Sequence, residues 1–296
     1  MRITVNGANL SLDLRDGGSL GELLADADAL LEKAGSVIVS MKIDGEEVDA
    51  DGYAHFAEKS VASIKSIEIL TEDSGAIRIR AIETLLELLA IAKRSSEDGA
   101  VGDWTGLRKG ANDMRDAFAG LFSADELSFV QLFAQIVDHA GDEPDRASRV
   151  EISAQTDRLS SVFSERLSEL LSPVGEMRTA ATLFETRASE LADLPVLLQT
   201  GKEDQAMKAV LFFIEIFNKV IRIIPELRRS GVDTTSISVD GLGMPEFYGA
   251  FNGVLRELTE AFEHTDAVLI GDLAEYEVLP RMRNFFLAMK EALPES

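Results

Sequence analysis

The sequence contains no cysteine and few of the other residues that usually carry chemistry. Its 296 residues include three histidines, three tyrosines and one tryptophan. Without cysteine, the chain has no disulfide, zinc–thiolate site, iron–sulfur cluster or thiol nucleophile. The histidines, His55, His139 and His264, are far apart, and none belongs to an HExxH or HxH pattern. A place near a helix C-terminus, where partial positive charge is favourable, explains His139 and His264.

Basic residues are also scarce, because 29 Lys and Arg are outnumbered by 52 Asp and Glu, for a net charge of −23. Such a charge repels nucleic-acid phosphates and anionic lipid. The pairs that come nearest to a basic cluster are Arg228 with Arg229 and Arg281 with Arg283. A position at a helix C-terminus or on a solvated face explains each pair. No segment approaches 18 uninterrupted apolar residues, and the first ten residues hold no signal-peptide run. We therefore expect a cytoplasmic protein that neither binds nucleic acid nor inserts into a membrane.

Motifs for catalysis and for nucleotide binding are missing as well. There is no GxSxG, and no SxxK with partner motifs. Gly241-Leu242-Gly243 lacks the third glycine of a dinucleotide fingerprint, and Gly201-Lys202 lacks the upstream glycine of a P-loop. We expect no cofactor and no enzymatic activity.

The first 73 residues have the pattern of a small α+β domain. Asn6-Gly7 and Asp44-Gly45 are strong two-residue hairpin signals between strand-like segments. A helix is expected from Ser19 to Gly35, and "SIEIL" supplies a last strand. The order ββαβ(β)β resembles a ubiquitin-like β-grasp domain. The segment has no terminal Gly-Gly, so the resemblance implies neither a sulfur carrier nor a conjugated modifier.

From about residue 75 the apolar period becomes helical. Helices are expected over about 75–98, 104–122, 123–140, 145–192, 200–229, 245–264 and 272–292. Pro173 is expected to kink the long fourth helix, and the apolar helix within 200–229 is expected at the centre of a bundle. The fold class is therefore α+β, with a β-grasp domain at 1–73 and a helical bundle at 74–296 that has a non-helical insertion near 230–245. A β-grasp head on a helical body also resembles uncharacterised bacterial proteins, which implies no activity.

A capping-box pattern, in which Ser, Thr or Asp precedes Glu by three residues, occurs at four expected helix starts. The four pairs are Ser19 with Glu22, Ser123 with Glu126, Thr200 with Glu203, and Asp272 with Glu275.

The acidic stretch "LIGDLAEYEVLPRM", residues 269–282, looks most like chemistry. On one helix Glu277 lies opposite the apolar stripe, where it can pair with Arg281, whereas Glu275 lies along the stripe. Because carboxylates so placed cannot converge, we favour Asp272 as a helix cap. The alternative is a metal site that adds Glu215, from the apolar helix, to Asp272 and Glu275.

Two other groups of residues have structural interpretations. The acidic segment 44–51 does not match the EF-hand spacing and is interpreted as a solvated hairpin tip. Gly249 and Gly253, four residues apart, are interpreted as a site of close helix packing.

The sequence favours a non-enzymatic protein-interaction or adaptor module with a basic or helical protein partner. One alternative is a metal-assisted hydrolase with an all-carboxylate site in the bundle. Another is a module that holds a partner's amphipathic helix in a groove between its own helices. Self-association into a homo-oligomer through the helix at 145–192 stays open beside these.

Overall fold

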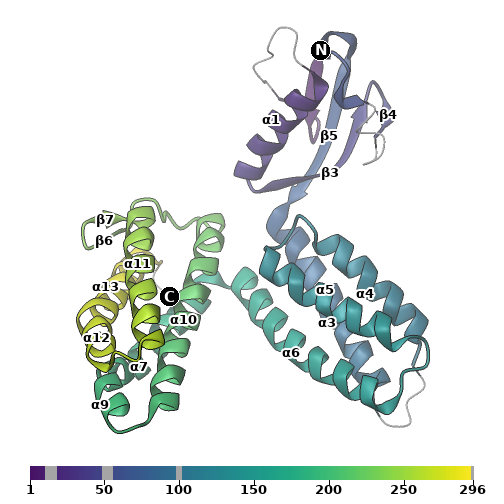
Figure 1. Cartoon of the computed structure of the whole chain (residues 1–296). Coiled ribbons are helices and arrows are strands. Elements are labelled where there is room, and N and C mark those ends of the chain that lie inside the picture. Colours follow the sequence, from purple (N-terminus) through teal and green to yellow (C-terminus); the bar gives the residue numbers. More distant parts are fainter. Residues whose placement is uncertain (11–18, 49–55, 98–101, 295–296) are drawn as a thin grey trace. The chain divides into compact units, whose positions relative to one another are not determined.

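The computed structural model describes residues 1–10, 19–48, 56–97 and 102–294, and it divides into two compact units, 1–167 and 168–296. About 72% of the structure is helical, with strands concentrated at the N-terminus (Figure 1). The expected α+β class, with an N-terminal β domain and helical bundles, is confirmed. The boundary expected after residue 73 coincides with the junction of a strand and a helix. That residues 1–73 form an independent domain stays a prediction.

The N-terminal unit begins with a five-stranded mixed sheet of order β2-β1-β5-β3-β4. Its elements are β1 (Arg2–Val5), β2 (Ala8–Asn9), α1 (Leu20–Lys33), β3 (Ser36–Ile43), β4 (Glu46–Glu47), η1 (Val61–Ser63) and β5 (Ser66–Asp73). The first and last strands, β1 and β5, are parallel, and the other neighbours are antiparallel. This arrangement is compatible with a β-grasp start of the chain.

Local sequence accounts for the turns and the core of this sheet. Both residues of each turn, Asn6-Gly7 and Asp44-Gly45, have positive φ. A two-residue type I′ hairpin requires this conformation. Leu20, together with the rest of the apolar stripe of α1, packs on the inner face of the sheet. The buried cluster contains Ile3, Leu20, Leu23, Leu24, Ala27, Leu31, Met41, Ile43, Val48, Ile64, Ile67 and Ile69.

The rest of the N-terminal unit is helical. Its helices are α3 (Ser74–Ser95), α4 (Trp104–Phe118), α5 (Ala124–Ala140) and most of α6 (Arg146–Leu171). Phe118 and Phe163 are fully buried and meet edge-to-face at 5.4 Å between ring centroids. Lys93 of α3 donates a 2.9 Å hydrogen bond to Ser153 of α6. The two contacts join α6 to helices that precede it in the chain, and the bonded Lys93 and Ser153 are 60 residues apart.

One long helix was expected over 145–192, but the structure has three successive helices there and a fourth directly after them. They are α6, α7 (Pro173–Arg187), α8 (Ser189–Ala192) and α9 (Leu194–Gln199). Ser172 has φ −141° and ψ 62°, outside the helical region. Because a proline disfavours helical backbone in the residue before it, Pro173 ends one helix and begins the next instead of kinking a single helix.

The C-terminal unit is organised around α10 (Glu203–Arg229), which packs against α7, α8 and α9. One face of α10 is buried, including Phe213, Val220 and Leu227. Leu211 and Met207 on the other face are exposed. The expectation that α10 would be enclosed at the centre of the bundle therefore holds for one face only.

After α10, the chain forms a short hairpin of β6 (Ser238–Val239) and β7 (Leu242–Gly243), then α11 (Met244–Glu263). The last helical run consists of α12 (Ala267–Asp272), a π-helical turn η2 (Leu273–Val278) and α13 (Leu279–Ala292). Phe247 of α11 stacks on Phe285 of α13, at 5.7 Å between ring centroids. Within the part of the chain that the structure describes, no helix is long and apolar enough to cross a membrane.

Candidate functional site

The three carboxylates of the alternative metal site are not grouped in the structure. Glu215, Asp272 and Glu275 are all exposed. Glu215 belongs to α10, whereas the other two belong to the run of α12 and η2. Across the described ranges, no group of three or more His, Asp or Glu side chains is arranged to hold a metal ion. In the acidic segment 44–51, Asp49 and Asp51 lie outside the described residues, as does His55.

Asp44, at the tip of the β3–β4 hairpin, has a structural task instead. Its Oδ1 accepts hydrogen bonds from the backbone N–H groups of Ser66 and Lys65, both at 2.8 Å. The bond from Ser66 is the largest influence that lowers the pKa of this carboxyl group below its ordinary value.

Two of the four expected capping boxes are formed. Ser19 Oγ accepts from the Glu22 N–H at 3.3 Å, and Glu22 Oε2 accepts from the Ser19 N–H at 3.1 Å. Ser123 and Glu126 make the same reciprocal pair at the start of α5.

The box expected at Thr200 is absent, because Thr200 ends α9 and does not begin α10. Gly201 has φ +73°, and the Lys202 N–H bonds the Leu197 carbonyl at 2.8 Å. This bond, with that from the Gly201 N–H to Leu198, forms a Schellman motif that terminates the helix. The Thr200 hydroxyl donates backwards to the Val196 carbonyl, and α10 begins at Glu203 without a side-chain cap.

The cap expected at Asp272 is also absent, because the helix has already begun at Ala267, five residues earlier. Asp266 is the N-cap, and its Oδ1 accepts from the Leu269 N–H at 3.0 Å. Asp272 has helical φ and ψ and makes no side-chain cap bond. Gly271 obscured this start in the sequence, since an isolated glycine resembles a helix stop. The expected pair of Glu277 with Arg281 is present.

Among the residues that the structure describes, three other carboxylates are buried, and each bonds an arginine. They are Glu126 with Arg166 at 3.0 Å, Glu169 with Arg222 at 3.1 Å, and Glu226 with Arg229 at 2.8 Å. A buried charge needs such a partner. Arg228 donates to Thr234 Oγ1 at 3.1 Å. Both arginines of the pair Arg228–Arg229 therefore have hydrogen-bond partners within the fold.

The glycines that allow close packing differ from those expected. A Cβ atom on Gly249 or Gly253 would meet nothing within 4 Å. On Gly271 it would lie 2.6 Å from Cγ of Pro195, at the start of α9. Of these three glycines, only Gly271 is therefore at a site of close packing, between α12 and α9.

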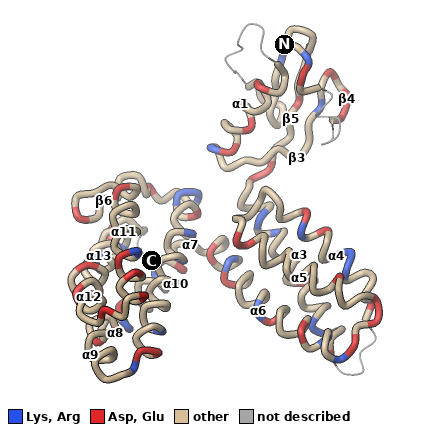
Figure 2. The backbone as a smooth tube through the Cα atoms, viewed as in Figure 1, with Lys and Arg blue, Asp and Glu red and all other residues tan. Residues whose placement is uncertain are grey.

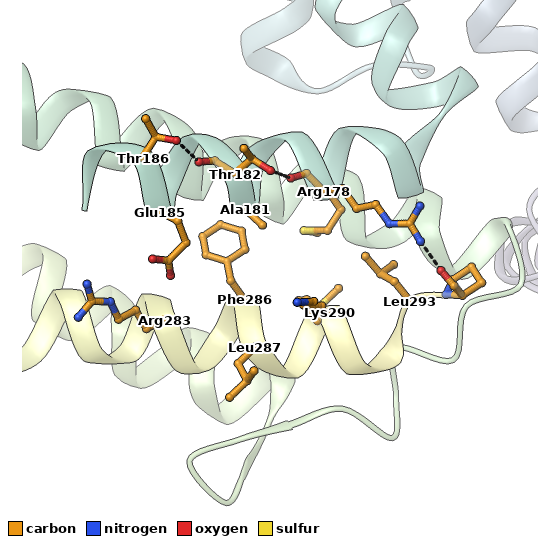
Figure 3. A pocket seen from close by; sticks show the side chains of 13 residues that line it. Arg178, Ala181, Thr182, Glu185, Thr186, Arg283, Phe286, Leu287, Lys290 and Leu293 are labelled. Atoms are coloured by element: carbon orange, nitrogen blue, oxygen red, sulfur yellow. Dashed lines mark hydrogen bonds between the residues drawn. The ribbon is translucent and has the colours of Figure 1, made fainter. Parts of the chain in front are cut away.

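The C-terminal unit has a groove of about 930 Å³ between α7 and α13. We call it the α7–α13 groove. Its lining consists of Met177, Arg178, Ala181, Thr182, Glu185, Thr186, Arg283, Phe286, Leu287, Met289, Lys290, Leu293 and Pro294. Figure 3 shows Ala181 and Glu185 pointing from α7 toward α13, with Phe286 between the two helices. Spacings of three and four residues place these side chains on facing helix surfaces.

The floor of the groove is apolar, and the threonine hydroxyls of its α7 wall are already used as donors. Met177, Phe286 and Met289 are buried and form the base. The hydroxyl of Thr182 donates to the Arg178 carbonyl at 2.9 Å, and that of Thr186 to the Thr182 carbonyl at 2.8 Å. Because these hydroxyl protons are donated to carbonyls of α7, the two threonines would contact a bound molecule mainly through their methyl groups.

The charge of the groove is opposite to that of the chain as a whole. Acidic residues recur along the helices (Figure 2), yet the lining holds three cations, Arg178, Arg283 and Lys290, and one carboxylate, Glu185. Arg178 donates a hydrogen bond to the Pro294 carbonyl. Arg283 and Lys290 are exposed and have neither an ion pair nor a hydrogen bond among the described residues. No local pattern in the sequence indicated this groove, since its two walls are about 100 residues apart.

Comparisons with known families match two separate parts of the chain. A family model described as "TP0873 N-terminal domain" matches residues 1–72, which is the region of the sheet and α1. A model described as "Domain of unknown function (DUF8042)" matches residues 176–286, from the first turn of α7 to the middle of α13. No curated protein and no solved structure matches the chain. The second match covers the α7 wall of the α7–α13 groove and the first part of its α13 wall, as far as Phe286.

Proposed function

We propose that this protein is a non-enzymatic, cytoplasmic protein-interaction module that binds a helix of a protein partner in the α7–α13 groove. Its N-terminal part is a ubiquitin-like β-grasp domain, a proposal supported by the strand order β2-β1-β5-β3-β4 with β1 and β5 parallel. The observation that carries the interaction function is the groove itself, which has an apolar floor between two helices and cations on its walls.

The dimensions of the groove suit an amphipathic helix. The α7 wall runs from Met177 to Thr186, which is about 14 Å at 1.5 Å per residue. That length accommodates two to three turns of a bound helix, whose apolar side chains would lie over Ala181 and Phe286. Helix-in-groove recognition of this kind uses anchors spaced three and four residues apart.

The free cations define the chemistry of the occupant more sharply than the net charge does. The overall charge of −23 suggests attraction of a basic partner. Arg283 and Lys290 instead select a helix that carries carboxylates beside its apolar face, because they would otherwise gain no ionic partner. The occupant is therefore an amphipathic helix with acidic flanks.

Photo-crosslinking tests this function in the cells that produce the protein. A photoreactive benzoyl-phenylalanine replaces Glu185, which is exposed and points across the groove (Figure 3). The expected result is a protein adduct that disappears when Arg283→Glu and Lys290→Glu are added. The control probe replaces Leu183, which is exposed on α7 but does not line the groove.

A matched control separates the groove from net charge. Lys208→Glu with Arg256→Glu makes the same change in charge at two exposed cations outside the groove, and the adduct should persist. Absence of any protein adduct at position 185, or an equal adduct at position 183, refutes the proposed function.

A further inference from the structure

A second surface of the C-terminal unit has the properties that the α7–α13 groove selects. Along α12 and η2, Val268 is 71% exposed, Leu269 43% and Tyr276 65%. Asp272 and Glu275 are exposed between them. Asp272 follows the pair Val268–Leu269 by four and three residues and precedes the pair Glu275–Tyr276 by three and four. The four residues 270, 271, 273 and 274 are buried, so the five exposed residues share one side of the helical run. We call them the 268–276 stripe.

Exposure of this stripe needs an explanation. Large apolar side chains exposed singly are ordinary, but three on one side of one short helical run form a patch typical of an interaction site. Neither carboxylate makes a hydrogen bond or an ion pair within the described part of the chain. The stripe is thus an amphipathic helix surface with acidic residues beside apolar ones.

We infer that the 268–276 stripe of one copy of this chain occupies the α7–α13 groove of a second copy. This inference rests on the proposed function, and it names the partner. Val268, Leu269 and Tyr276 would cover the apolar floor. Asp272 and Glu275 would face Arg283 and Lys290, which gives each free cation a carboxylate.

The lengths of the two surfaces agree. From Val268 to Tyr276 the stripe extends about 12 Å, and the α7 wall of the groove extends about 14 Å. The stripe and the groove share no residue. Each copy therefore offers both surfaces. Two copies can form a closed dimer in which each stripe binds the groove of the other copy, or successive copies can associate head-to-tail into a larger assembly.

Two charge-reversed variants of the full chain test the inference by sedimentation velocity. The stripe variant is Asp272→Lys with Glu275→Lys, and the groove variant is Arg283→Glu with Lys290→Glu. Each variant alone places like charges across the contact, and self-association should weaken by at least ~10-fold relative to the wild-type chain. An equimolar mixture should associate again, because the intact stripe of one variant meets the intact groove of the other.

Controls exclude misfolding and unspecific charge effects. All four positions are exposed, so each variant should keep the circular dichroism and melting temperature of the wild-type chain. The variant Lys208→Glu with Arg256→Glu should associate like the wild type. A wild-type chain that stays monomeric up to ~1 mM, or a mixture that sediments as the two separate variants, overturns the inference.

The outcome for the proposed function is read separately. If the Glu185 probe forms an adduct with a peptide of this chain that contains residues 268–276, both statements are supported. If the adduct contains a different protein, the inference fails and the proposed function stands. If no protein adduct forms, the proposed function fails.

Discussion

Replacing Glu126 by alanine should destabilise the helical part of the N-terminal unit more than any other single change at the start of α5. Glu126 is 6% exposed. Its Oε1 accepts from Arg166 Nε at 3.0 Å, and its Oε2 accepts from the Ser123 N–H at 3.0 Å and from Ser123 Oγ at 2.7 Å. One carboxylate thus closes the capping box of α5 and joins this helix to α6.

The expected loss in the free energy of unfolding is about 3 kcal/mol. Removing one partner of a buried ion pair costs about 3–5 kcal/mol, and losing a cap costs about 1 kcal/mol. The low end applies because the Arg166 side chain is 14% exposed and water can reach it after the change.

Urea unfolding followed by tryptophan fluorescence measures this loss in the right part of the molecule. The single tryptophan, Trp104, is buried in α4, which packs against α5. Asp125→Ala is the matched control, because Asp125 is exposed in the same helical turn, and it should change stability by less than about 0.5 kcal/mol. A Glu126→Ala chain within about 0.5 kcal/mol of the wild type refutes the reasoning.

The contribution of Glu126 should depend on pH. Burial by itself would raise the pKa of Glu126, but the hydrogen bonds from Ser123 and the charge of Arg166 hold that pKa below its ordinary value of 4.5. Since the pKa is lowered on folding, the stabilisation is complete above 4.5 and is lost as the pH falls through the folded-state value. The stability difference between wild type and Glu126→Gln should therefore be constant near neutral pH and shrink in acid.

Two further predictions concern the helices of the C-terminal unit, and calorimetry of the full chain tests both. Gly271→Ala should destabilise by about 1 kcal/mol, because the overlap with Pro195 exceeds the gain in helix propensity. Gly253→Ala has open space and should stabilise by about 0.5–1 kcal/mol; the opposite order would contradict the packing at Gly271. Asp266→Ala should cost about 1 kcal/mol as the loss of an N-cap. Asp272→Ala should cost less than about 0.5 kcal/mol, and a larger loss at Asp272 would reverse the assignment of the cap.

Local patterns were sufficient where all the interacting atoms lie within a few residues. The turns at Asn6-Gly7 and Asp44-Gly45 formed as expected, because positive φ at two successive positions is a local requirement. The capping box at Ser19 formed for a similar reason, since its partner Glu22 is three residues away. The helical period likewise located most of α3, α5, α10 and α11.

The same local patterns failed where a neighbouring segment decided the conformation. Thr200 with Glu203 has the capping-box spacing of Ser19 with Glu22, but the left-handed backbone at Gly201 ends the previous helix there. Asp272 with Glu275 has that spacing too, yet Asp266 had already started the helix. A capping side chain acts only if its own backbone is outside the helix, and the residue pattern alone does not specify this.

The sequence by itself determined the α+β class, the two hairpin turns, the majority of the helices and the absence of thiol chemistry. Only the tertiary structure decided which carboxylates are buried and which surfaces remain without a partner. Glu215 lies among apolar residues in the sequence, and the exposed face of α10 carries it. The α7–α13 groove combines Arg178 with Arg283 and Lys290, which are about 100 residues further along the chain. The reason is physical: the burial of a helix face depends on which other helices cover it, and long-range packing sets that choice.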